Sequence, residues 1–295
     1  MPTFLNVETL AAVSRQLNRL PYAGGFRPWV THLQRRDIER CRAASQQPVE
    51  IILPGGGQRM IVDRSERIGN LFFWIGRHHR QQVQLAKKLL PTDGVFLDVG
   101  ANVGEFTVAM AIDKPQAKIL AIEPNPIVRT NLEANITANH LTNVSVLPIA
   151  LGDQEGTETL YQCNDSLLTS FVPISSDHAA TAEAEVCMLD NLVRSMSLDR
   201  LDVVKIDVEG FELKVLSGAK QSLARFRPSI IIEINTITST AAGFDVSDVY
   251  ELLRSQGYRF FAWRNRRWQN VENNLPTQED VWAEPDERVS KTRSP

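Results

Sequence analysis

Hydrophobic and polar positions follow two different patterns along this chain, and the change comes near residue 95. Before it, Leu10, Val13 and Leu17 recur at helical spacing with polar residues between them, which predicts an amphipathic helix. A second helix is predicted over residues 28–44, and a β-hairpin over residues 49–62, where two β-type runs flank Pro-Gly-Gly-Gly. The apolar run LFFWI that follows has the length of a core strand.

Short apolar runs then alternate with amphipathic stretches. Strands are predicted at residues 95–99, 118–122, 144–149, 183–188, 201–206, 229–234 and 258–263, and helices at 105–112, 126–139, 212–223 and 246–256. This alternation is typical of an α/β fold with a mostly parallel sheet and helices on both faces. We therefore divide the chain into an N-terminal extension of helices and a hairpin (1–85), an α/β domain (86–271) and a polar, proline-containing tail (272–295) that we expect to fray.

Composition excludes several classes of protein. The formal net charge is −3, which argues against a nucleic-acid binder. Three widely spaced cysteines make a disulfide framework or a zinc cluster unexpected, and they suit a reducing compartment. No apolar run approaches the roughly 20 residues of a membrane helix, and the first residues lack the pattern of a secretory signal. These features predict a soluble cytoplasmic protein without a membrane span.

Acidic residues stand at or near the ends of five predicted strands. They are Asp98, Glu123, Asp153, the pair Asp207 and Glu209, and Glu233, which is followed by Asn235. Parallel α/β sheets bind ligands at the carboxyl ends of their strands. Because carboxylates are rarely buried without partners, we expect a cationic or hydroxyl-rich ligand at this edge.

The segment LDVGANVG, residues 97–104, joins the first of these strands to a helix. Its glycines are spaced GxxxG and not GxGxxG, no GxxxxGK[ST] occurs, and Asp98 would repel a pyrophosphate. Glu123 follows about 20 residues later, where an acid can bind both hydroxyls of a ribose. That feature is shared by nicotinamide and S-adenosylmethionine sites, but Asp98 together with Asp207 favours the sulfonium cofactor.

Four stretches occur in one order between residues 95 and 235: FLDVGANVGEFTVAMA, AIEPNPIVRTNLEAN, KIDVEGFELKVLSGA and RPSIIIEIN. Together they resemble the FkbM family of class I S-adenosylmethionine-dependent methyltransferases. The resemblance implies a Rossmann-like fold with a seven-stranded, mostly parallel sheet whose last strand is antiparallel, and methyl transfer to a hydroxyl. Relatives often carry a tyrosine-glutamate pair after a glycine like Gly76, whereas this chain has Arg77, His78 and His79.

The resemblance also implies a set of residues that bind S-adenosylmethionine. In this chain they are Asp98, Gly100, Ala101, Asn102, Gly104, Glu123, Asn125, Asp153 and Asp207. The glycines would let the backbone approach the methionine moiety, Asp98 would bind its amino group, and Glu123 would bind the ribose. Plainer structural roles stay open: a helix N-cap for Asp98, and turn residues for Asn125 and Asp153.

The predicted catalytic residues are Asp207, Glu209 and Glu233. An alcohol loses its proton as its oxygen is methylated, so a positioned carboxylate can act as the base. We assign that role, or acceptor binding, to Glu209, with capping of the next helix as the alternative. Either His78 or His79 is an alternative base.

No metal belongs to the main prediction. A magnesium ion held by Asp207, Glu233 and Asn235 is kept as an alternative, because oxygen ligands on adjacent strands suit that ion.

Two other functions remain open from the sequence. A nicotinamide-dependent oxidoreductase is disfavoured, because no tyrosine is followed by lysine four residues on. A non-catalytic protein that binds the cofactor on a methyltransferase fold is compatible with the pattern. For a methyltransferase, the acceptor would be a small molecule or a carbohydrate, in a pocket covered by residues 1–85 and the loop 163–182.

Overall fold

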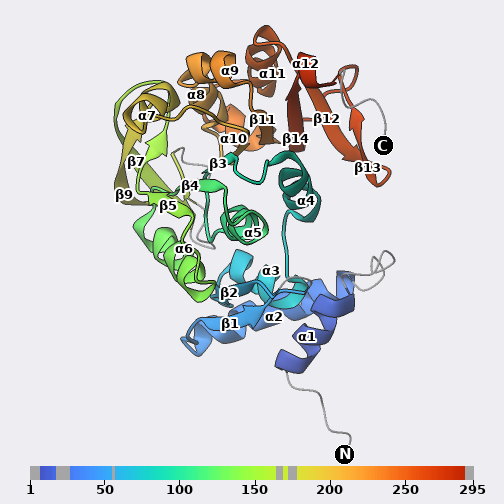
Figure 1. Ribbon diagram of the computed structural model, residues 1–295. Helices are drawn as coiled ribbons and strands as arrows, with labels where there is room; N and C mark the ends of the chain where they lie inside the picture. Colours follow the sequence, from blue (N-terminus) through green and yellow to red (C-terminus); the bar gives the residue numbers. More distant parts are fainter. Residues whose placement is uncertain (1–6, 18–26, 55–56, 164–168, 172–177, 290–295) are drawn as a thin grey trace, which may run out of the picture.

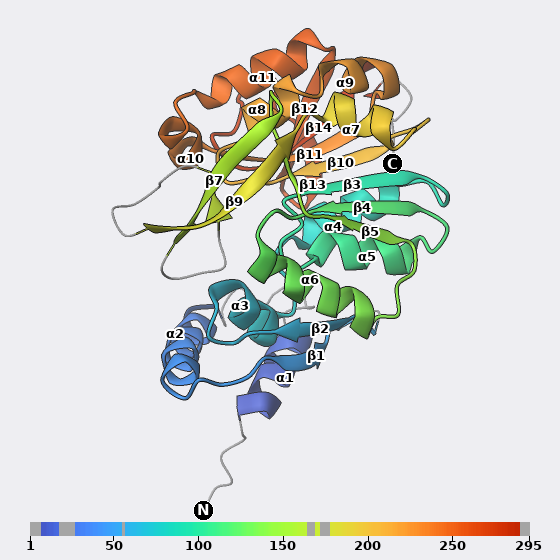
Figure 2. The ribbon, with the colours of Figure 1, turned by 90° about the vertical axis from the view of Figure 1, so that its left-hand side faces the viewer.

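The computed structural model describes residues 7–17, 27–54, 57–163, 169–171 and 178–289. An α/β domain forms the larger part, and an N-terminal unit lies at one end of it (Figures 1 and 2). The domain is built on a sheet with the order β13-β12-β14-β11-β10-β3-β4-β5. These strands are β3 (Val95–Val99), β4 (Lys118–Ile122), β5 (Val144–Leu147), β10 (Val203–Ile206), β11 (Ser229–Asn235), β12 (Tyr258–Arg264), β13 (Arg267–Asn270) and β14 (Gln278–Pro285).

The central strands are parallel, so their carboxyl ends meet at one edge of the sheet. β10 lies between β3 and β11, with Lys205 opposite Asp98 on one side and Ile231 on the other. The residues of β3 and β10 are all buried, as expected for strands covered on both faces. The predicted α/β fold with a mostly parallel sheet is confirmed. In the described part of the chain this sheet has eight strands and not the expected seven, because β13 pairs with β12 at its edge.

Helices cover both faces of this sheet (Figure 1). On one face lie α4 (Arg80–Leu89), α5 (Glu105–Asp113) and α6 (Pro126–Ala138). The other face carries α7 (Leu189–Ser195), α8 (Glu212–Ser217), α9 (Lys220–Phe226) and α11 (Val246–Ser255). The single helix expected over 212–223 is divided in two. Gly218 is the C-cap of α8, and a Cβ there would overlap the carbonyl oxygen of Gly152.

The prediction of a frayed tail over residues 272–295 is wrong for most of that segment. Residues 278–285 form β14, which lies between β11 and β12 and is antiparallel to both. Val281 and Ala283 are fully buried there, because alternate residues of the strand face a covered side of the sheet. β14 is therefore the antiparallel last strand, and α12 (Asp286–Val289) follows it. Residues 290–295 lie outside the described part.

A second sheet, with the order β6-β9-β7-β8, stands beside the main one. Its strands are β6 (Ala150–Leu151), β7 (Gly156–Cys163), β8 (Thr169–Ser170) and β9 (His178–Cys187). The expected strand over 183–188 is thus the end of β9. The expected loop over 163–182 is in part strand, and its residues 164–168 and 172–177 lie outside the described residues.

The N-terminal unit contains α1 (Val7–Leu17), α2 (Arg27–Ala43), α3 (Arg67–Ile75) and the hairpin of β1 (Val49–Ile52) and β2 (Arg59–Val62). The predicted hairpin is confirmed. The run LFFWI, expected to be a strand, belongs to α3, where Phe72, Phe73 and Trp74 fill the core of this unit. None of the described helices has the length and apolar character of a membrane span.

Two asparagines of α6 attach the hairpin to the α/β domain. Asn135 accepts a hydrogen bond from the backbone N–H of Ile61 at 2.6 Å and donates one to the carbonyl of Val103 at 2.8 Å. Asn139 accepts from the N–H of Arg59 at 2.8 Å and donates to its carbonyl at 2.7 Å. The two asparagine side chains thus make the hydrogen bonds to β2 that a neighbouring strand would make. Asn135 also links the N-terminal unit to the glycine turn, residues 100–104.

Candidate active site

A cavity opens where the carboxyl ends of β3, β4, β10 and β11 meet α3 of the N-terminal unit. Of the predicted site residues, its lining includes Gly100, Ala101, Asn102, Glu123, Asp207, Glu209 and Glu233. Ile68, Phe72, Leu160 and Phe171 supply apolar walls. The cavity therefore combines the glycine turn and the strand-end acids, as the parallel arrangement predicts.

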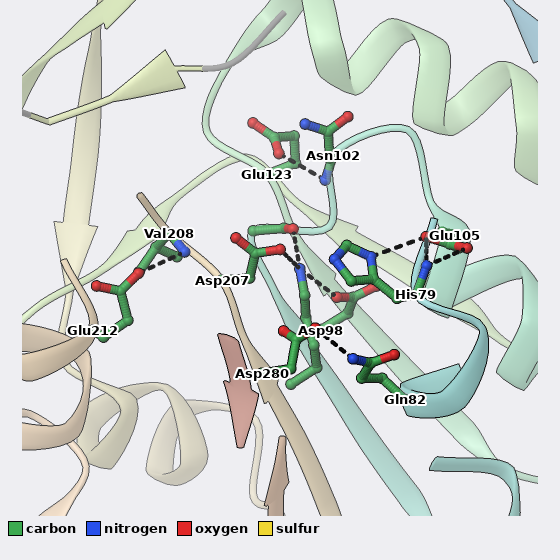
Figure 3. Close-up of polar contacts among 12 residues, drawn as sticks. His79, Gln82, Asp98, Asn102, Glu105, Glu123, Asp207, Val208, Glu212 and Asp280 are labelled. Atoms are coloured by element: carbon green, nitrogen blue, oxygen red, sulfur yellow. Dashed lines mark hydrogen bonds and ion pairs between the residues drawn. The ribbon is translucent and has the colours of Figure 1, made fainter. Parts of the chain in front are cut away.

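Lys205 links two acids at the floor of the cavity, Asp98 and Asp207, and Figure 3 shows both acids. Its buried ammonium donates to the carbonyl oxygen of Gly100 at 2.6 Å and lies 3.4 Å from Asp207 Oδ2 and 3.6 Å from Asp98 Oδ1. Burial alone would lower the pKa of Lys205, but the charges of Asp207 and Asp98 outweigh it and raise that pKa. Burial would likewise raise the pKa of Asp207, and the charge of Lys205 overcomes it and lowers that pKa. Asp207 is therefore an ionised acid at the centre of the site.

Asp98 lies behind the glycine turn and not in the cavity wall. Its side chain is 1% exposed, and its Oδ2 accepts hydrogen bonds from the backbone N–H and the hydroxyl of Thr107, at 3.0 and 2.6 Å. These contacts tie the first turn of α5 to β3. Asp98 therefore fits the structural role left open above, in which it binds a backbone N–H group at the start of a helix, better than a role in direct contact with a ligand.

Glu123 follows β4 and lines the cavity, although it is 4% exposed. Its carboxylate accepts hydrogen bonds from the backbone N–H groups of Asn102 and Asn125, both at 2.9 Å. Burial raises the pKa of Glu123 to about 7. The side chain of Asn125 caps α6 by accepting from Ile127 N, so it has the turn role that the sequence left open.

Three carboxyl groups converge at the ends of β10 and β11. Asp207, Glu209 and Glu233 each offer one oxygen within 4.8 Å of the others. Burial, and next the charge of Asp207, raise the pKa of Glu209 to about 7 and that of Glu233 to about 10. At neutral pH Glu233 is thus a neutral acid beside the ionised Asp207, and its Oε2 has no hydrogen-bond partner among the described residues.

Glu209 does not cap the following helix. It has a left-handed backbone, with φ of 50°, and its carbonyl oxygen accepts from the hydroxyl of Ser170 at 2.8 Å. Glu212 accepts instead from the backbone N–H groups of Val208 and Gly210. The loop is fixed from both sides, which leaves the side chain of Glu209 in the cavity wall. An outlying backbone of this kind is frequent at functional sites.

Besides Asp98 and Asn125, three predicted residues do not line the cavity. Gly104 begins α5, and a Cβ there would press against Leu132. Asp153 is exposed in a turn after β6, which belongs to the second sheet. Asn235 caps α10 (Thr236–Ala241) by accepting from Ile237 N at 3.1 Å. Its side chain is therefore turned to the helix, and the magnesium set proposed from the sequence is not assembled.

Two further groups of the site were not predicted from the sequence. Glu105, in the first turn of α5, accepts hydrogen bonds from the backbone N–H groups of His78 and His79 and lies 3.0 Å from Nδ1 of His79. Asp280 of β14 accepts from Gln82 at 2.6 Å, and burial raises its pKa to about 6. An alternating pattern around Asp280 could have revealed the strand, whereas nothing in the sequence links Glu105 to His79.

Comparison with known proteins finds methyltransferases among the relatives of this chain. Residues 98–260, more than half of the chain, match the methyltransferase FkbM domain. The chain is 29% identical over 217 residues to the hexuronic acid methyltransferase AglP of Haloferax volcanii, which covers 71% of this chain and 81% of AglP. It is 24% identical over 205 residues to the 31-O-demethyl-FK506 methyltransferase FkbM of Streptomyces tacrolimicus, covering 59% and 76%.

Other matches are partial. The chain is 30% identical over 207 residues to the AMB antimetabolite synthetase AmbE of Pseudomonas aeruginosa, covering 58% of this chain but only 10% of that protein. The solved structure of a methyltransferase FkbM from Methylobacillus flagellatus KT is 14% identical, with a TM-score of 0.42, over 73% of this chain and 52% of that one.

Proposed function

This chain belongs to the FkbM methyltransferase family, and we propose that it transfers the methyl group of S-adenosylmethionine to a hydroxyl oxygen of a small molecule or sugar. One observation carries the proposal: a single cavity joins the glycine turn and Glu123 to the carboxyl cluster of Asp207, Glu209 and Glu233.

The residues present suit S-adenosylmethionine. Glu123 is a buried acid at the end of β4 and could accept hydrogen bonds from a ribose diol. The backbone of Gly100 and Ala101 borders the same space, and the ionised Asp207 favours a positive centre. When bound, this cofactor supplies an electrophilic methyl group. No described residue of the cavity provides the phosphate-binding pattern that a dinucleotide would need.

We assign proton removal from the acceptor hydroxyl to Glu209. Its pKa near 7 matches the working range of a general base, since the carboxylate is available and still basic at neutral pH. Glu233, as a neutral acid, can donate a hydrogen bond to the same oxygen, and Asp207 orients the groups around it. General-base assistance of this kind contributes about a hundred- to ten-thousand-fold in rate.

A small-molecule or sugar acceptor is supported by the relatives. AglP acts on a hexuronic acid, and the Streptomyces protein acts on 31-O-demethyl-FK506, as their names state. The apolar walls formed by Ile68, Phe72 and Phe171 and the polar floor suit an acceptor with one apolar face and several hydroxyls.

The test is transfer of a radiolabelled methyl group from S-adenosylmethionine to a panel of hydroxylated sugars, hydroxy acids and macrolides. We expect label in an alkali-stable ether, and a loss of about a hundredfold or more in Glu209→Gln. Asp153→Asn, which alters an exposed acid outside the cavity, should retain full activity. Label in an alkali-labile ester, or equal activity in the two variants, would contradict the assignment.

A further inference from the structure

His79 and Glu105 form a fixed pair in the cavity wall that the reaction described above does not use. His79 Nδ1 lies 3.0 Å from Glu105 Oε2, and the same carboxylate accepts the backbone N–H groups of His78 and His79. Both side chains are largely buried, at 19% and 12% exposure. A carboxylate anchored by backbone donors therefore holds the imidazole in one orientation.

That orientation turns the second ring nitrogen of His79 away from Glu105, toward the side of the cavity where Asp207 lies (Figure 3). His79 lines the cavity, and no hydrogen bond to its Nε2 is made within the described part of the chain. Glu105 is also the one acid of that part within ion-pair distance of His79. An oriented ring nitrogen is thus directed into the cavity without a protein partner.

The charges around the two histidines determine which of them is protonated. Burial lowers the pKa of His79, but the hydrogen bond and charge of Glu105, with smaller effects of Asp280 and Asp207, raise it to about 9. Burial and the charge of His79 lower the pKa of His78 to about 4, so His78 is neutral at pH 7. The histidine side of the cavity therefore presents one cationic N–H group.

The opposite side has different chemistry. The free Oε2 of the neutral Glu233 and the carboxylate of Glu209 suit a hydroxyl group, and the negative charges of Glu209 and Asp207 would repel an anion bound next to them. A ligand that satisfies both sides carries an anionic oxygen toward His79 and a hydroxyl toward Glu209 and Glu233.

We propose that His79 is a specificity-determining residue, and that the acceptor is a hydroxy acid whose carboxylate binds His79 Nε2 beside the hydroxyl to be methylated. This inference rests on the proposed methyl transfer and adds the chemical class of the acceptor. Glu105 acts through His79 and is a positioning residue.

Two small probes test it without knowledge of the whole acceptor. Glycolate has a hydroxyl beside a carboxylate, and ethylene glycol has a second hydroxyl in place of that carboxylate. Each is titrated into the protein, with and without S-adenosylhomocysteine, while NMR follows the imidazole Cε1–H resonances. The chain has five histidines, so these signals can be assigned by substitution.

We expect glycolate to shift the His79 resonance saturably and to bind about tenfold or more tightly than ethylene glycol, as a hydrogen bond between charged groups implies. The preference should vanish in His79→Gln and persist in His32→Gln, which alters an exposed histidine of α2. An unmoved His79 resonance, or equal binding of the two probes by the wild type, overturns the inference. Absence of S-adenosylhomocysteine binding would instead count against the methyltransferase proposal, because the glycolate titration is also read without it.

Discussion

Gly100 packs so closely against the backbone of Asp207 that a Cβ on Gly100 would overlap the carbonyl oxygen of Asp207. The glycine also has φ of 75°, a left-handed conformation that other residues adopt with strain. Position 100 must therefore be glycine first of all because the backbones that follow β3 and β10 lie so close together. The turn that faces the ligand and the loop that carries the acids are built against each other.

Gly100→Ala should therefore lower the free energy of unfolding by about 3 kcal/mol or more, because both the backbone conformation and the contact with Asp207 are disturbed. Urea denaturation measures this loss. Gly156→Ala is the matched control, since a Cβ there meets nothing within 4 Å, and it should change stability by less than about 1 kcal/mol. Equal losses in the two variants would contradict the packing argument.

Lys205→Met should be strongly destabilising. Removing the cation leaves Asp98 and Asp207 without their shared partner, and breaking a buried ion pair costs about 3–5 kcal/mol. Lys87→Met, which removes a surface pair with Asp113, should cost less than about 1 kcal/mol. Denaturant unfolding of both variants at pH 7 provides the comparison, and a Lys205→Met protein as stable as Lys87→Met would refute the role of the buried ammonium.

Glu233 makes a pH-dependent contribution to stability whose sign can be worked out. Its pKa is raised in the folded protein from 4.5 to about 10, so the folded state holds this proton more tightly than the unfolded state. The stabilisation is fully present below pH 4.5 and declines as pH rises toward 10.

Glu233→Gln removes this decline, so its stability relative to the wild type should increase between pH 5 and pH 9. Unfolding at three pH values measures the difference. Glu251→Gln, an exposed position of α11, should show the same offset from the wild type at every pH. A Glu233→Gln offset that is also independent of pH would mean that Glu233 is ionised in the folded protein.

Asn135 should couple the N-terminal unit to the glycine turn. Asn135→Leu leaves the N–H of Ile61 and the carbonyl of Val103 without their partners, at about 1–3 kcal/mol for each buried group. Hydrogen exchange of residues 59–62 should accelerate in this variant and not in Asn191→Leu, a half-buried position of α7 away from the hairpin. Unchanged protection of β2 would show that the hairpin is held without Asn135.

The sequence predicted the parts of this fold that depend on local pattern. Buried parallel strands such as 95–99 read as continuous apolar runs, and the acids that follow them gather because parallel strands end at one edge. Glu123, Asp207, Glu209 and Glu233 were predicted to lie together for this reason, and all four line one cavity.

The errors have equally physical causes. β14 was missed because acids interrupt its apolar residues: Glu284, for example, is buried and accepts from Trp282 Nε1 at 2.9 Å. The run LFFWI has no alternation of apolar and polar residues, so its pattern fits a short buried strand as well as a helix buried on several sides. Asp153 was misplaced because the chain leaves the main sheet after β5. The contact of Glu105 with His79 spans 26 residues and depends on how α5 and the start of α4 pack.

The most direct test of the account is calorimetric titration of S-adenosylmethionine into the wild type, Glu123→Gln and Asp153→Asn. Glu123 lines the cavity and Asp153 does not, although both acids follow strands. We expect binding by the wild type and Asp153→Asn, and an affinity about tenfold or more lower in Glu123→Gln, as the loss of a hydrogen bond to a charged group implies. Failure of the folded wild type to bind S-adenosylmethionine, or a larger effect at Asp153 than at Glu123, would contradict the site described above.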